Sequence, residues 1–116
     1  MAIKLYIVKK MNYEAKSTEN ISIIKEILQE LSVNVGVFDE NKKLDIKFCI
    51  NASTNEKKEL FQLDVNYRVV LSSVLKNPNK EKIAEIVKEL YPNFKNFVKD
   101  FYNKQAGLNN LEPPEF

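Results

Sequence analysis

The sequence predicts an α+β fold: a four-stranded antiparallel sheet (meander), a short helix or strap between the first two strands, and two C-terminal helices. Two observations predict this class. Apolar and polar residues alternate with a period of two through much of residues 1–74, as in strands that bury one face. Beyond residue 77 the apolar spacing changes to three and four residues, which is typical of helices. We therefore expect a single domain over residues 1–116, divided into a sheet region (1–74), two helices (77–106) and an extended tail (107–116).

The first predicted elements are a strand and a connecting segment. Residues 3–8, IKLYIV, form a short apolar run bounded by two lysines, which predicts a strand. The following segment, residues 19–31, has apolar residues at helical spacing, namely Ile24, Ile27, Leu28 and Leu31. A helix cap is available at Ser17, Thr18 or Asn20. The pattern favours a short helix or strap, although the β-branched cluster at residues 21–24 also allows a strand at its start.

The middle of the chain predicts three further strands. Residues 33–38 and 44–52 alternate on either side of a polar turn at 39–42, which indicates a β-hairpin. A second polar turn at 53–58 precedes the longest predicted strand, residues 60–73. Its apolar side chains share one face and are Phe61, Leu63, Val65, Tyr67, Val69 and Leu71. Polar residues occupy the alternate positions, so we expect one face of this sheet to meet solvent.

The C-terminal third predicts two helices separated by a proline. Asn77-Pro78-Asn79 ends the last strand, and either asparagine could cap the first helix. The apolar stripe of that helix comprises Ile83, Ile86, Val87 and Leu90. Pro92 has no amide hydrogen and biases Tyr91 away from helical geometry, so we expect a second helix to begin there. The second stripe comprises Phe94, Phe97, Val98, Phe101 and Tyr102.

The composition argues against catalysis. The chain has no histidine, the commonest general acid–base group, and its single cysteine, Cys49, has no partner for an internal disulfide. With only two glycines, the sequence contains no recognisable phosphate-binding loop, and no metal-ligand spacing occurs. We therefore expect no enzyme activity, no cofactor and no metal ion, and a buried, inert role for Cys49.

The charge balance and the short apolar runs argue against nucleic acid and membranes as partners. The 18 Lys and Arg residues nearly balance the 16 Asp and Glu residues, and Arg68 is the only arginine. Because arginine dominates base and bidentate phosphate recognition, we expect no nucleic-acid partner. No apolar run approaches the roughly 18 residues of a membrane helix, and the N-terminus has no signal-peptide pattern. We expect a cytoplasmic protein without membrane insertion.

Four short features, in this order, carry a resemblance to a known family. They are Tyr13 with Glu14; Leu90-Tyr91-Pro92; Ala106-Gly107-Leu108; and Leu111 with Pro113, Pro114 and Phe116. Together with the order of elements they resemble the SecB family of protein-export chaperones and its smaller relatives associated with toxin–antitoxin systems. In that family a leucine–aromatic–proline step separates two helices, a glycine ends the second, and a proline-containing tail closes on phenylalanine. The resemblance covers residues 3–116.

The resemblance implies a chaperone that holds unfolded polypeptides in an apolar groove between the second helix, the strap and the sheet. The candidate client-binding residues are Phe38, Phe97, Phe101, Leu108 and Leu111. It also implies a homo-oligomer, a dimer or a tetramer, whose candidate interface residues on the first helix are Ile83, Ile86, Val87 and Leu90. An apolar stripe at helical spacing can equally pack into the core of the monomer, and we leave that alternative open for both helices.

Three departures from the family pattern bear on function. Residues 19–31 look more helical than the family's connection, and Asn109 stands where the family often has proline. The sequence also ends at Phe116, without the acidic, metal-binding extension that export SecB presents to its motor protein. This last departure favours an alternative function: a dedicated interaction protein, such as a phage- or plasmid-encoded inhibitor or an antitoxin accessory, that grips one specific partner.

Overall fold

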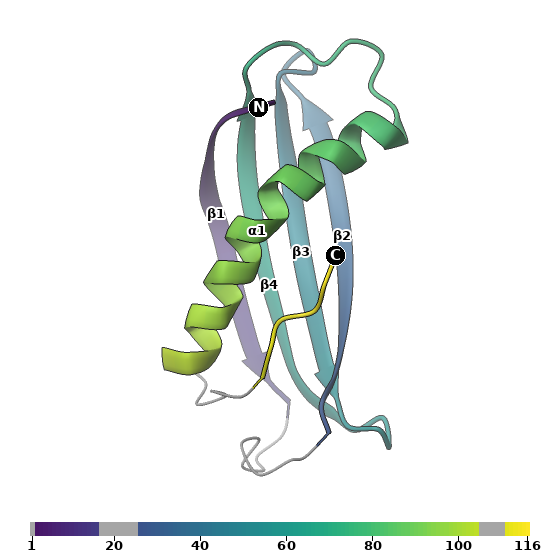
Figure 1. Ribbon diagram of the computed structural model, residues 1–116, viewed down its shortest axis with the longest axis vertical. Helices are drawn as coiled ribbons and strands as arrows, with labels where there is room; N and C mark the ends of the chain where they lie inside the picture. The colour runs from purple at the N-terminus through teal and green to yellow at the C-terminus, as the bar shows by residue number, and fades with distance from the viewer. Residues whose placement is uncertain (1, 17–25, 105–110) are drawn as a thin grey trace.

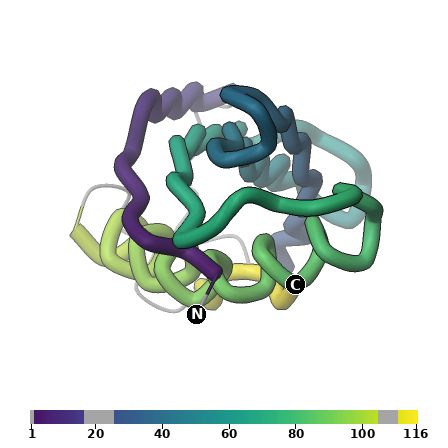
Figure 2. Tube along the Cα trace, turned by 90° about the horizontal axis from the view of Figure 1, so that it is seen from above, coloured from purple at the N-terminus to yellow at the C-terminus, as the bar shows by residue number. Residues whose placement is uncertain are grey.

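The computed structural model describes residues 2–16, 26–104 and 111–116. Within these ranges the chain forms one sheet with one long helix packed on a single face (Figure 1). In chain order the elements are β1 (Ile3–Ala15), β2 (Leu28–Phe38), β3 (Lys43–Ser53), β4 (Glu59–Leu71) and α1 (Lys80–Lys104). Figure 2, seen from above, shows the sheet curving over α1, which lies on one side of it only. We call the opposite side the outer face of the sheet.

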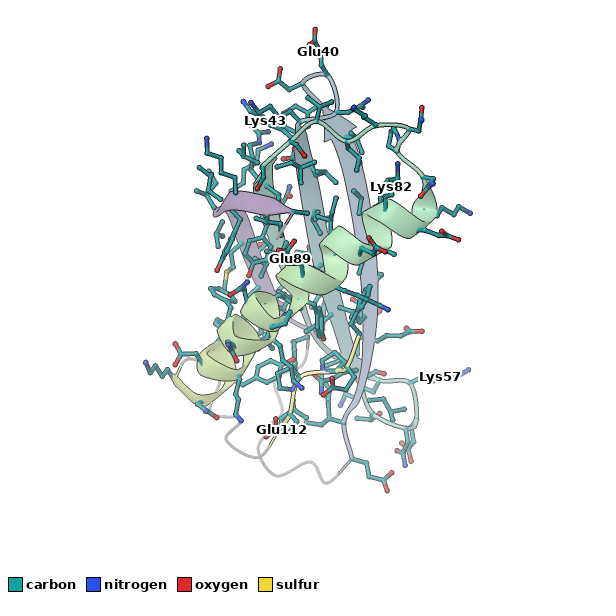
Figure 3. All side chains as sticks on the ribbon, turned by 45° about the horizontal axis from the view of Figure 1, so that its top comes forward. Glu40, Lys43, Lys57, Lys82, Glu89 and Glu112 are labelled. Atoms are coloured by element: carbon teal, nitrogen blue, oxygen red, sulfur yellow. The ribbon has the colours of Figure 1, made fainter. Side chains whose placement is uncertain are left out.

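The sheet has the strand order β1-β4-β3-β2, and all three pairings are antiparallel. The predicted four-stranded antiparallel sheet is confirmed, and β2, β3 and β4 follow one another as hairpins. A simple meander would place β1 beside β2, and this detail is wrong because β1 pairs with β4. The two hairpin turns lie at opposite ends of the sheet, where Figure 3 shows Glu40 and Lys57.

Strand β1 is longer than its apolar run predicts. The prediction ends the strand at Val8, but β1 continues to Ala15 along the whole length of β4. The register shifts between Val8 and Lys10, which marks a β-bulge that absorbs one residue. Beyond it Met11 and Tyr13 return to the helix side, opposite Val65 and Leu63. The bulge interrupts the period of two, so the pattern alone cannot follow the strand past this point.

The connection between β1 and β2 corrects a second prediction. Leu28 and Leu31, assigned to a short helix by their spacing, lie in β2, and Ile27 directly precedes that strand. These two residues lie opposite Ser53 and Ile50 in the β2–β3 ladder, and this strand pairing outweighs their helical spacing. Ile24 and the proposed capping residues lie outside the described residues.

The C-terminal region contains one continuous helix, so the prediction of two helices is wrong. Helix α1 runs through Pro92, which is exposed on the side away from the sheet. Its buried residues lie before and after the proline at one helical spacing and are Ile86, Val87, Leu90, Tyr91, Phe94, Val98 and Tyr102. This continuous stripe packs on the sheet, and its burial outweighs the roughly 3 kcal/mol that an interior proline costs.

The start of α1 is fixed by one of the two predicted caps. The side-chain oxygen Oδ1 of Asn79 accepts a hydrogen bond from the backbone amide of Lys82 at 2.9 Å. This satisfies one of the amides that has no partner in the first turn of a helix. Asn77 instead adopts a positive φ of 51° in the preceding loop. Gly107, the predicted C-terminal cap, lies outside the described residues.

The core lies between α1 and the helix side of the sheet. Its centre is an aromatic cluster, in which the rings of Phe48 and Phe94 stack with centroids 4.5 Å apart. Tyr67 and Tyr91 meet these rings edge-on or tilted, and all four side chains are buried. The other buried residues of the sheet include Leu44, Ile46, Ile50, Leu60, Leu63 and Val65. Across the described ranges, no helix is long and apolar enough to cross a membrane.

Candidate functional site

Exposed apolar side chains concentrate on β1. Of the eight large apolar side chains that are exposed in the described residues, five belong to this one strand. Tyr6, Val8 and Met11 lie on the helix side and are 39%, 46% and 37% exposed, whereas Leu5 and Ile7 lie on the outer face and are 48% and 55% exposed. Such a cluster on one edge indicates an interaction surface rather than scattered surface residues.

The diagonal path of α1 explains why β1 is left uncovered. The helix starts at the β2 edge of the sheet, crosses the sheet diagonally and ends on the β1 side (Figure 1). Contact with β1 is close at that end, where the rings of Tyr13 and Phe101 lie 5.0 Å apart. Nearer the start of β1, one hydrogen bond joins the two elements, from the backbone amide of Ile3 to Oε2 of Glu89 at 3.2 Å. Most of β1 therefore lacks helical cover.

Two hollows lie between β1 and α1. The first, of about 340 Å³, is lined by Ile3, Lys4, Leu5, Tyr6, Glu89 and Asn93. The second, of about 390 Å³, is lined by Met11, Phe97, Asp100, Phe101 and Lys104. The apolar side chains at and between these hollows form what we call the β1 surface, defined as Tyr6, Val8, Met11, Phe97 and Phe101. The charged residues that also line the two hollows are Lys4, Glu89, Asp100 and Lys104.

The five candidate client-binding residues do not form one cluster. Phe97 and Phe101 lie together in the second hollow, beside Met11. Phe38 lies on the outer face, where the guanidinium carbon of Arg68 stands 4.8 Å from its ring centroid. Leu111 packs against the core at the start of the extended segment 111–116, which we call the tail. Leu108 lies outside the described residues.

Sequence reasoning missed the β1 half of this surface. Its signal is present in IKLYIV, where Leu5 and Ile7 occupy one face of the strand and Tyr6 and Val8 the other. A strand that is apolar on both faces is usually covered on both sides. Here β1 is an edge strand, so the same pattern marks surface that the chain itself does not bury.

The candidate oligomer residues lie at the helix–sheet contact. Ile86, Val87 and Leu90 are buried in the core of the single chain, and Ile83 is partly buried at its margin. The monomer core, the alternative that the stripe left open, accounts for the burial of these side chains. Their part in an oligomer stays a prediction.

The outer face of the sheet is largely polar and held by charge pairs. Arg68 donates two hydrogen bonds to Asp45, from Nε at 3.0 Å and from Nη2 at 3.2 Å, and Lys9 lies 3.4 Å from the same carboxylate. The hydrogen bonds from Arg68 hold the pKa of Asp45 below its ordinary value. This bidentate pair joins β3 to β4 on the outer face.

Titratable groups near the core are held in their neutral forms. Burial, reinforced by Asp64, raises the pKa of the Cys49 thiol to about 11. Burial also raises the pKa of Tyr91 to about 12, with a further contribution from the charge of Glu115. In the part of the chain that the structure describes, no three carboxylate or thiol groups converge in a way that could hold a metal ion.

Comparisons with known proteins define the class of fold. No family model matches the sequence, and no curated protein matches it significantly. The structure is similar to that of a Mycobacterium tuberculosis SecB-like chaperone, solved in complex with a ChAD peptide from the HigA1 antitoxin. The two share 11% sequence identity and a TM-score of 0.66, over 98% of this chain and 88% of that chain. A protein of unknown function from Streptococcus agalactiae is also 11% identical, with a TM-score of 0.44 over 97% of this chain and 94% of that one.

The fold is therefore that of a SecB-like chaperone. The resemblance stated from the sequence is confirmed at the level of the fold, because the similarity spans nearly all of this chain.

Proposed function

We propose that the chain is a SecB-like holding chaperone that binds extended apolar segments of other polypeptides on the β1 surface. The observation that carries this proposal is the concentration of exposed apolar side chains on β1, next to Phe97 and Phe101. The fold supports it, because the similar M. tuberculosis chaperone was solved with a bound peptide. Apolar, aromatic side chains offer large contact area with few rotatable bonds, which suits clients of varied sequence.

The required affinity is modest. Micromolar binding corresponds to about 8 kcal/mol, and apolar burial contributes roughly 25 cal/mol per Å². Several hundred Å² of apolar contact are therefore needed, and more once the entropy lost on association is included. Five adjacent apolar side chains on two elements can supply contact on this scale for an extended segment.

The proposal is tested by aggregation of a denatured test enzyme after dilution from guanidinium, followed by light scattering. An equimolar amount of the chain should suppress the scattering. Phe97→Glu should weaken suppression several-fold, whereas Asn96→Glu, which adds the same charge at the exposed neighbouring position, should not. If the native chain neither suppresses aggregation nor binds an environment-sensitive apolar dye, the proposal is wrong.

A dedicated interaction protein is the second candidate. The peptide held by the M. tuberculosis chaperone comes from one antitoxin, which favours a specific partner over many clients. Affinity purification from the native host separates the two functions. One stoichiometric partner would favour the dedicated protein, and a broad set of unfolded polypeptides would favour the general chaperone.

We also propose that the chain works as a homo-oligomer in which β1 pairs with β1 of a second copy. An edge strand carries unpaired backbone groups, and antiparallel self-pairing about a two-fold axis satisfies them on both copies at once. Leu5 and Ile7 would meet their counterparts on the outer face, and Tyr6 and Val8 would meet theirs on the helix side. Light scattering after size exclusion should give a dimer or tetramer, reduced to monomer by Ile7→Lys but not by Asn12→Lys. A monomeric native chain would contradict this proposal.

We infer that the chain is not an enzyme. The inference is supported by the absence of histidine from the sequence and by the raised pKa of Cys49. The predicted cytoplasmic location stays a prediction.

A further inference from the structure

The tail lies extended against the chain, beside α1 and toward β2 (Figure 1). Two of its residues face inward, because Leu111 packs against the core and Pro113 is buried. The ring of Phe116 lies 5.4 Å from that of Tyr91, at an interplanar angle of 34°. The tail therefore occupies a surface on the opposite side of α1 from the β1 surface.

Two hydrogen bonds hold the backbone of the tail. Nε2 of Gln29, in β2, donates to the carbonyl oxygen of Glu112 at 2.7 Å. The hydroxyl of Tyr91 donates to the carbonyl oxygen of Pro114. Gln29 is itself positioned, because the buried hydroxyl of Tyr102 donates to its Oε1 at 2.6 Å. Side chains that hold backbone carbonyls can hold any extended segment, since every residue supplies that acceptor.

The charges around the tail are complementary. Lys99 lies 3.7 Å from the carboxylate of Glu112, and Lys95 pairs with Glu115. Both lysines belong to α1, whereas both carboxylates belong to the tail, which Figure 3 shows at Glu112. A surface with two lysines at its rim therefore faces an acidic, proline-containing segment. We use the name tail site for four of the residues that contact it, namely Gln29, Tyr91, Lys95 and Lys99.

We infer that the tail site is a second peptide-binding surface, which accepts an acidic, proline-containing extended segment of a partner protein in exchange for the tail. This inference rests on the proposed function, since it adds a site and a ligand class to a peptide-binding protein. The contacts suit exchange rather than permanent cover: Glu112, Glu115 and Phe116 are exposed, and exposed ion pairs hold weakly.

An occupied site lowers the apparent affinity for a competing peptide. A tethered segment acts at a high effective concentration, and a peptide binds only the fraction of molecules whose tail is undocked. A substitution that weakens docking of the tail but leaves the tail site intact should therefore increase the affinity for an external peptide. Loss of the Phe116 ring contact and of one ion pair should change that affinity by about tenfold.

The test measures fluorescence anisotropy of a labelled peptide, LEPPEF, the sequence of residues 111–116, on the full-length chain. The variant Glu115→Lys/Phe116→Ala should bind the peptide about tenfold more tightly than the native chain. Adding Lys95→Glu to this variant should remove most of that gain, whereas adding Lys104→Glu, in the hollow beside β1, should not. The peptide LKPPKF, in which lysine replaces both glutamates, should bind more weakly than LEPPEF.

Two results would overturn the inference. One is a tail variant that binds LEPPEF no more tightly than the native chain, and the other is binding that Lys104→Glu abolishes and Lys95→Glu does not. Both altered tail residues are exposed, so the variant should keep its fold, and circular dichroism checks this. Suppression of aggregation by the native chain is read separately, which distinguishes failure of the tail site from failure of the proposed function.

Discussion

Replacing Pro92 with alanine tests whether α1 is one continuous helix. In the interior of a helix, proline removes one backbone hydrogen bond, and its ring crowds the carbonyl four residues earlier, here that of Lys88. Pro92 is exposed, so alanine at this position loses little buried area. The substitution should therefore report on the backbone of α1 rather than on packing.

The expected gain is about 2 kcal/mol in the free energy of unfolding. Alanine is about 3 kcal/mol more favourable than proline inside a helix. Proline also restricts the unfolded chain, and losing that restriction offsets about 0.4–1 kcal/mol of the gain. For a chain whose total stability is expected near 5–15 kcal/mol, a change of this size is readily measured.

Urea unfolding followed by far-ultraviolet circular dichroism gives the measurement. The unfolding midpoint of Pro92→Ala should rise while the slope with urea stays unchanged. The control Asn96→Ala, also exposed on α1, should gain no more than about 0.7 kcal/mol from helix propensity alone. Equal or lower stability of Pro92→Ala would refute a helix that continues through residue 92, because a break at that position favours proline.

Three further predictions follow from the core, the outer face and the buried thiol. Phe94→Ala should lose about 3–5 kcal/mol in urea unfolding, since the ring is fully buried and stacked on Phe48, and a loss under about 1 kcal/mol would contradict this packing. The pKa of Asp45 is lowered in the folded chain, so its ionised form stabilises the fold above about pH 4, and this contribution is lost as pH falls through the lowered pKa. In the Asp45→Asn variant the free energy of unfolding should fall less steeply at acid pH than in the native chain. An equally steep fall would contradict a stabilising role for ionised Asp45. The Cys49 thiol, with its pKa raised to about 11, should resist alkylation at mildly alkaline pH until urea unfolds the chain, whereas rapid labelling of the folded chain would show that it is not protected.

Local sequence patterns predict the strands because a strand that buries one face has an apolar residue at every second position. From Phe61 to Leu71 every second residue is apolar, and β4 buries this face under α1. In β1 the alternation predicts a strand only as far as Val8, because the β-bulge after Val8 shifts the alternation by one residue. Pairing of β1 with β4 depends on contacts between residues far apart in the chain, which no local pattern contains.

Competition between local rules and packing explains the other errors. Pro92 predicts a break, but an apolar stripe that continues from Ile86 to Tyr102 keeps α1 intact. Leu28 and Leu31 have helical spacing, but pairing with β3 places them in strand β2. In both cases tertiary contacts outweigh local preference.

The candidate site could be predicted only in part for a similar reason. Phe97 and Phe101 are recognisable from helical spacing and aromatic character. Their neighbours Tyr6, Val8 and Met11 become part of the same surface only because α1 crosses the sheet diagonally and leaves β1 bare. The crossing direction is set by the packing of the whole core, so the sequence of β1 alone does not reveal which of its side chains stay exposed.

Hydrogen exchange measured by mass spectrometry, with and without a saturating unfolded polypeptide, tests the central claim most directly. Binding on the β1 surface should slow exchange in segments covering residues 3–15 and 94–104. The β3–β4 turn, residues 54–58, should exchange at an unchanged rate. Unchanged exchange throughout, or protection confined to segments outside β1 and the second half of α1, would contradict the claim that this surface holds other polypeptides.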